Sequence, residues 1–193
     1  MDGWKLQEVQ QINQDNGKLH EAPDGEHKIE ESESEKYLGQ IISSDGLNVK
    51  NIINLSNKGR GMIENIMGIL NHTPGGIFHF ELAIMMRNAY LISSMLSCCE
   101  VWYNLSEWEL RKLEQTDEML LRKVLDCSYQ ITSEMLSLEL GLFPVRFIIK
   151  LRRVIYLQHI LKQKEKNTFL FQFYEAQCME PKKNYWVSQV QKS

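Results

Sequence analysis

The stretch Lys36-Tyr37-Leu38-Gly39-Gln40-Ile41-Ile42-Ser43-Ser44-Asp45-Gly46 marks the point where the chain changes from strand-like to helical patterning. Its aromatic and β-branched apolar residues are typical of a short strand, which Gly39 interrupts. The polar residues at its end supply turn chemistry. Beyond it, apolar residues recur at the helical period almost to the end of the chain. We therefore expect a mainly α-helical fold with a short N-terminal β-hairpin.

The hairpin is expected to pair a first strand over 25–30 with a second over 37–42, joined by a solvated acidic connection. The residues before it are polar and carry turn signals, so they are expected to be flexible or weakly helical. The predicted organisation is that N-terminal segment over 1–26, the hairpin over 27–46, a first helical unit over 47–104, a second over 105–166, and an amphipathic piece and tail over 167–193.

Charge is distributed unevenly along the 193 residues, although the net charge is only −3. Residues 1–36 hold ten acidic and four basic side chains, whereas residues 146–166 hold seven basic and one acidic. Only the second segment is a plausible phosphate-facing surface. The four cysteines lack the spacing of a disulfide framework or a zinc site, and nothing reads as a secretion signal. We therefore expect a cytoplasmic or nuclear protein that is not secreted and has no membrane span.

Individual helices carry their own structural signals. The most apolar one is expected over 77–103, with Arg87 paired to a carboxylate inside the bundle. Ser106 and Glu109 form a predicted capping box, and Ser133 is expected to cap a short helix that stops at Gly141. The last long helix is expected to hold Pro144 in its first turn and His159 in its core face; the full list of expected core residues there is Val145, Ile148, Ile149, Ile155, Tyr156, His159 and Ile160.

The stretch 36–45 resembles the junction between palm and thumb in non-LTR (LINE-type) retrotransposon reverse transcriptases, where a Tyr-Leu-Gly strand precedes an Ile-Ser-x-Asp-Gly turn. Further blocks follow in the same order and extend the resemblance over roughly residues 27–165; they are 91–94 with 100–102, 122–125, 141–144, Arg152-Arg153 and His159-Ile160. The resemblance implies that the chain is a thumb and connector with a palm remnant.

In such polymerases the hairpin is the primer grip, so the resemblance assigns Tyr37, Leu38 and Gly39 to the primer end. A glycine there lets a sugar-phosphate backbone come close to the strand. The alternative is a hairpin that only packs on the helices. The resemblance likewise places Lys50, Asn54 and Lys58 of the first long helix along the groove of a template-primer duplex, where cations and amides bind without sequence preference. An ordinary solvated helix face has a similar composition.

A basic row on the last long helix is the strongest phosphate-binding candidate that follows from the residues alone. Arg146, Lys150 and Arg153 fall at i, i+4 and i+7, and Arg152 lies beside them. The alternative is that this basic surface pairs with the acidic N-terminal segment.

The carboxylates of a polymerase centre are missing from this sequence. Reverse transcription uses metal ions held by clustered carboxylates, but the six aspartates are scattered and no Asp-Asp pair occurs. No cofactor is therefore expected, and magnesium would belong to the missing palm. The expected function is sequence-tolerant binding of an RNA or DNA template-primer duplex, together with a missing palm and fingers, without polymerase activity from this chain alone. The alternatives are a helical protein-interaction module and a transposon remnant without function.

Overall fold

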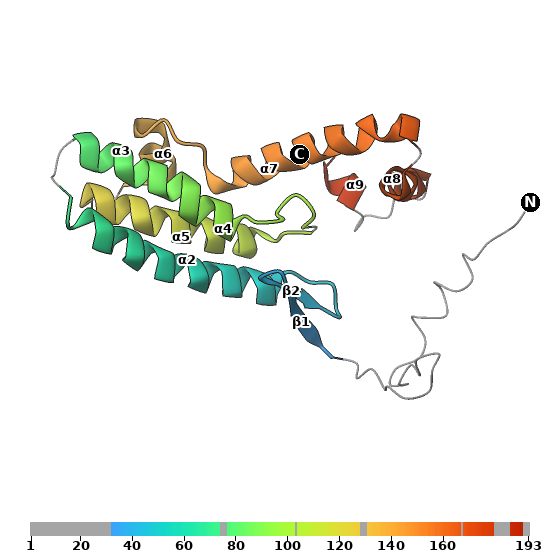
Figure 1. Cartoon of the computed structure of the whole chain (residues 1–193), viewed down its shortest axis with the longest axis horizontal. Helices are drawn as coiled ribbons and strands as arrows, with labels where there is room; N and C mark the ends of the chain where they lie inside the picture. Colours follow the sequence, from blue (N-terminus) through green and yellow to red (C-terminus); the bar gives the residue numbers. More distant parts are fainter. Residues whose placement is uncertain are drawn as a thin grey trace, which may run out of the picture.

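The computed structural model describes residues 32–73, 77–102, 104–127, 131–166, 168–179 and 186–190. It is mainly helical, with a two-stranded antiparallel hairpin before the first long helix, which confirms the predicted fold class (Figure 1). Its elements are β1 (Ser34–Tyr37), β2 (Gln40–Ser43), α2 (Val49–Leu70), α3 (Ile77–Met86), the π-helical turn η1 (Arg87–Ile92), α4 (Ser93–Met95), α5 (Glu107–Leu125), α6 (Ser133–Glu139), α7 (Val145–Lys162), the 3-10 turn η2 (Lys164–Lys166), α8 (Phe169–Met179) and α9 (Trp186–Val190).

The strand pairing differs from the prediction. β1 and β2 flank a two-residue turn at Leu38 and Gly39, so that Tyr37 lies opposite Gln40 and Ser34 opposite Ser43. Both turn residues have positive φ, 47° and 83°, which is the backbone twist that joins two strands most tightly. The strand predicted over 37–42 therefore contains the turn and most of β2, and its partner is Ser34–Tyr37; the predicted partner strand over 25–30 lies outside the described residues.

Three helical layers run beside one another, because each has an apolar face that must be buried. α2 packs along α5 and along the path formed by α3, η1 and α4, whereas α7 crosses the end of this bundle and carries α8 and α9 (Figure 1). Two clusters make the core. The first joins α2, η1, α4, α5 and α7 through buried residues such as Leu55, Leu96 and Leu113; the second joins α2, α3, η1 and α5 through residues such as Ile63, Leu91 and Leu120.

Most of the predicted helix positions and helix caps are present in the structure. The first long helix, predicted to carry Lys50, Asn54 and Lys58, is α2, and Ser106 and Glu109 form the predicted capping box. The predicted Ser133 cap is wrong, because the Thr132 hydroxyl accepts the hydrogen bond from Met135 N. Pro144 lies at the N-cap of α7, directly before its first turn.

Two predictions about longer helices need correction. The helix expected over 77–103 ends at Met95, because the backbone leaves the helical region at Leu96 and turns left-handed at Cys98. His159 and Ile155 were expected in the core face of α7, but the His159 ring is exposed and stacks on Tyr156 at 6.5 Å, and Ile155 is also exposed. Helical spacing alone places His159 beside apolar neighbours, yet only one side of α7 faces the bundle.

Candidate nucleic-acid interface

The hairpin is fixed to α2 by the side chain of Asn51, which is buried. Its Oδ1 accepts a 2.9 Å hydrogen bond from Ile41 N, and its Nδ2 donates to Gln40 Oε1 at 2.7 Å. Gln40 Nε2 in turn donates to Ser97 Oγ at 2.6 Å. This chain of amides holds the hairpin, α2 and the end of α4 in a fixed arrangement. The sequence did not single out Asn51. The only feature that could have indicated its role is an amide side chain one helical turn before the buried Leu55.

The hairpin tip projects into solvent beside an apolar cleft. Leu38 is 83% exposed, and Tyr37 next to it is also exposed. A cleft of about 380 Å³ lies between the hairpin, the start of α2 and the segment that follows α4, and its walls include Ile42, Leu47 and Val101. Ser43 also lines this cleft, and its buried hydroxyl has no hydrogen-bond partner. The tip predicted to lie near a primer end is therefore accessible.

Leu38 has the left-handed backbone conformation, which costs most side chains about 1–2 kcal/mol but which asparagine tolerates. Because Leu38 is largely exposed, little packing is lost on replacement. We expect Leu38→Asn to raise the free energy of unfolding by about 0.5–1 kcal/mol in a denaturant titration. Leu138→Asn is the matched control, since Leu138 is 80% exposed within α6 and asparagine is the poorer helix former. An equal effect of both changes contradicts strain at Leu38.

One face of α2 is polar and open to solvent, and no acidic side chain lies on it along most of its length. At about 100° per residue the predicted Lys50, Asn54 and Lys58 share this face. Gly61 lies on the same face, and a Cβ atom built there meets no atom within 4 Å. The whole face consists of Lys50, Asn54, Asn57, Lys58, Gly61, Asn65 and Gly68. Glu64 borders it and pairs with Lys123 at 2.5 Å.

Lys50 brings this face next to the hairpin, since its Nζ lies 4.0 Å from Glu33 Oε2 directly before β1. The cations and amides predicted for a duplex groove thus begin beside the base of the hairpin. The residues predicted for the primer end, Tyr37 to Gly39, are at the other end of the hairpin, beside Gln40, which Asn51 of α2 holds. The first turn of α2 therefore contacts the hairpin both at its base and next to its tip.

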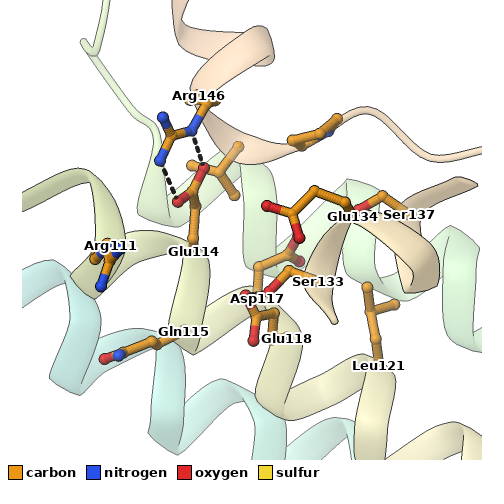
Figure 2. Close-up of a pocket in the computed structure, with 12 residues that line it drawn as sticks. Arg111, Glu114, Gln115, Asp117, Glu118, Leu121, Ser133, Glu134, Ser137 and Arg146 are labelled. Carbon is orange, nitrogen blue, oxygen red and sulfur yellow. Dashed lines mark hydrogen bonds and ion pairs between the residues drawn. The ribbon is translucent and has the colours of Figure 1, made fainter. Parts of the chain in front are cut away.

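The predicted basic row on α7 does not form. Arg146 donates to both carboxylate oxygens of Glu114, at 2.6 and 2.9 Å, and lies 3.5 Å from Glu107 (Figure 2). This hydrogen bonding with Glu114 raises the pKa of Arg146 above its ordinary value. Both carboxylates come from α5, and most of the acidic N-terminal segment named in the alternative lies outside the described residues.

The next two arginines hold the backbone that follows α4. Arg152 Nη1 donates to Leu96 O at 2.7 Å, and Arg153 Nη2 donates to Trp102 O. Arg153 is only 7% exposed, and this burial lowers its pKa. Carbonyl groups at the end of a helix lack helical partners and attract cations. The expectation that Arg146, Arg152 and Arg153 face phosphate as an open row is therefore wrong in its geometry, and only Lys150 of the four is exposed.

Acidic side chains gather in a cavity of about 330 Å³ between α5, α6 and the start of α7 (Figure 2). Three of them are already paired, Glu114 with Arg146, Asp117 with Arg87 and Glu118 with Arg122. Across the described ranges no group of three or more His, Cys, Asp or Glu side chains is arranged to hold a metal ion.

The cysteines Cys98, Cys99, Cys127 and Cys178 are free thiols. Burial raises the pKa of Cys99 to about 11, and nearby Arg152 opposes this shift. Cys99 therefore packs as a neutral thiol. None of the helices in the described part of the chain combines the length and apolar character needed to cross a membrane.

Fold and surface together define a helical bundle with a hairpin fixed to its first long helix and an open polar face along that helix. Comparison of the chain with protein-family models, with curated proteins and with solved structures finds no match.

Proposed function

We propose that this chain is a nucleic-acid-binding thumb and connector of the kind found in LINE-type reverse transcriptases. It binds a template-primer duplex without sequence specificity and has no polymerase activity by itself. The palm and fingers that would complete the enzyme, and the magnesium ions they would hold, come from outside the described residues. The compartment is one that keeps thiols reduced, either cytoplasm or nucleus.

The observation that carries this proposal is that the first turn of α2 contacts the hairpin both at its base and next to its tip, and that the open polar face of α2 starts at this same turn. Lys50 and Lys58 supply charges for phosphate, and the asparagines supply donors and acceptors for sugars and base edges. Gly61 and Gly68 remove side chains where a duplex backbone has to come close. Tyr37 and Leu38 are exposed at the hairpin tip beside Gly39, and we assign this tip to the primer end. Lys150 on α7 remains a predicted phosphate contact, separate from this face.

A binding titration with two charge variants tests the proposal. The probe is a fluorescent RNA–DNA duplex with a recessed 3′ end, measured by anisotropy with the full chain at several salt concentrations. We expect Lys50→Glu/Lys58→Glu to weaken binding by about tenfold or more and to reduce the slope of log affinity against log salt by about 2, because two phosphate contacts are lost. Arg60→Glu is the matched control, since Arg60 is an exposed cation on another side of α2.

Gly61→Leu probes close approach without changing charge. Because the space beside a Cβ at Gly61 is empty, the Gly61→Leu variant should fold normally and should weaken only duplex binding. The proposal is wrong if the chain fails to bind at low salt, if binding lacks a salt slope, or if Arg60→Glu weakens it as much as the double reversal does.

A further inference from the structure

The outer side of α7 is apolar, although it faces solvent. The helix buries Val145, Ile149 and Ile160 against the bundle. At about 100° per residue, a second apolar stripe lies on the opposite side of the helix. Its members are between 42% and 55% exposed; they are Phe147, Leu151, Val154, Ile155 and Leu161. A surface helix ordinarily carries polar residues on that side, so this stripe has the composition of a contact surface.

The spacing of the stripe is that of a seam between two helices. Phe147, Leu151, Val154, Gln158 and Leu161 follow one another in steps of four and three, which is the heptad pattern of coiled coils. Phe143 stacks on Phe147 at 4.9 Å and extends the stripe by one turn. The helix that carries the stripe, α7, extends beyond the bundle of α2, α3 and α5 (Figure 1). A straight, heptad-spaced surface fits a partner helix better than a compact ligand.

The charges beside the stripe identify the kind of partner helix. All five Lys, Arg, Asp or Glu residues of α7 are cations. Arg146, Arg152 and Arg153 are held by oxygen atoms of this chain, as described above. Lys150 and Lys162 are exposed and occupy positions that flank a heptad seam. A second α7 would add cations and no carboxylate, whereas a helix with flanking carboxylates is complementary in charge.

We propose that the exposed stripe of α7 docks an acidic amphipathic helix of a partner protein. Its apolar residues pack along Phe147, Leu151 and Val154, and its flanking carboxylates pair with Lys150 and Lys162. This surface lies on a different helix from the open face of α2, so it stands whether or not α2 binds nucleic acid.

Two designed peptides test the proposal with the full chain. Each has three heptads with leucine at both seam positions; one carries glutamate at the flanking positions and the other lysine. In an anisotropy titration the glutamate peptide should bind about tenfold or more tightly than the lysine peptide. Leu151→Glu should weaken the glutamate peptide by about tenfold or more, whereas Met85→Glu, which changes an exposed apolar residue of α3, should leave its affinity unchanged.

Charge reversal gives a test that does not depend on the leucine variant folding. Lys150→Glu/Lys162→Glu should invert the preference, so that the lysine peptide becomes the tighter ligand. Equal affinity for both peptides, no binding of the glutamate peptide, or equal losses in Leu151→Glu and Met85→Glu would each overturn the proposal. A concentration-dependent dimer that Leu151→Glu converts to a monomer in sedimentation would also overturn it, because a second copy would then occupy the stripe.

Discussion

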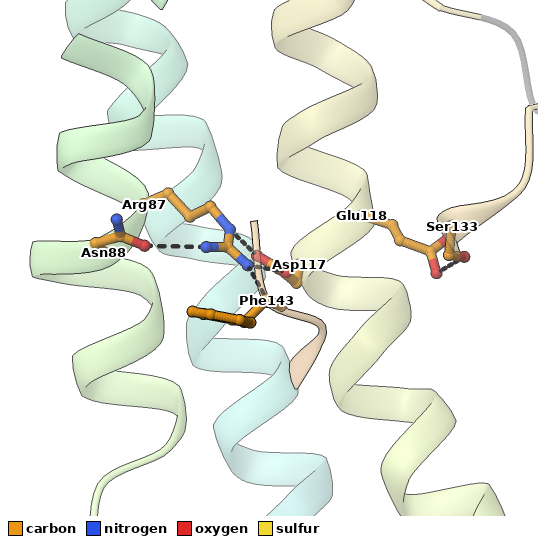
Figure 3. A network of polar contacts seen from close by, with 6 residues as sticks. All are labelled: Arg87, Asn88, Asp117, Glu118, Ser133 and Phe143. Atoms are coloured by element: carbon orange, nitrogen blue, oxygen red, sulfur yellow. Dashed lines mark hydrogen bonds and ion pairs between the residues drawn. The ribbon is translucent and has the colours of Figure 1, made fainter. Parts of the chain in front are cut away.

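Arg87→Met is expected to lower the free energy of unfolding by about 3–5 kcal/mol, because it leaves a buried carboxylate without its partner. Arg87 Nε and Nη2 donate to the two carboxylate oxygens of Asp117 at 2.7 and 2.6 Å (Figure 3). The Arg87 side chain is 2% exposed, and Asp117 is buried with it. Arg87 Nη1 also donates to Asn88 Oδ1 at 2.9 Å. The network therefore connects η1 with α5 inside the bundle.

Two further variants separate an unpaired charge from a loss of packing. Arg87→Met/Asp117→Leu removes both charges and should recover most of the lost stability, since buried pairs often exchange for apolar residues at little cost. Lys123→Met removes the 2.5 Å contact with Glu64, a pair that is largely exposed, and should change the unfolding free energy by less than about 1 kcal/mol. Urea titrations of all three variants measure these values. A loss in Arg87→Met no larger than that in Lys123→Met would contradict the assigned role of the buried pair.

Gly59→Ala is expected to lower the free energy of unfolding by about 1–3 kcal/mol, because α2 and α5 approach too closely for a side chain there. A Cβ on Gly59 would lie 2.9 Å from Thr116 Cγ2 and 3.3 Å from Leu91 Cδ1. Thr116 cannot rotate away freely. Its hydroxyl shares a 2.6 Å hydrogen bond with Ser56 and donates to Lys112 O at 3.0 Å.

Gly61 provides the matched control on the same helix. Gly61→Ala meets empty space and should raise the unfolding free energy by about 0.5–1 kcal/mol, since alanine is the better helix former. Thr116→Ser removes the obstructing methyl group and keeps the hydroxyl. It should therefore lower the unfolding free energy less when it is added to Gly59→Ala than when it is made alone. Thermal or urea unfolding of the four variants measures this coupling. Similar gains from both alanine substitutions would show that the helices can move apart.

The ion pair of Arg87 was predictable from the sequence only in part. A single arginine on a very apolar helix has to find a carboxylate, and that expectation is confirmed. The sequence did not indicate that Asp117, rather than another acid of α5, is the partner, because that choice depends on how two helices pack.

The prediction that the arginines after Pro144 form an exposed basic row was wrong for a related reason. On a helical projection Arg146, Arg152 and Arg153 form a basic surface, but a projection carries no information about neighbours. The carboxylate of Glu114 and the carbonyl groups of Leu96 and Trp102 lie within reach only in the folded chain. Burial of Arg153 thus follows from where the α3–α4 path ends.

Local interactions set the elements of this protein. The period of the apolar residues, the Ser106 capping box and the turn residues after Ser43 act within a few positions, so they can be read from the order of residues. The hydrogen bonds through Asn51, the partners of the arginines on α7 and the exposure of the stripe on α7 depend on how segments pack against one another. Only packing in three dimensions settles those, because the same side chain is a surface charge or a buried strut according to what lies opposite it.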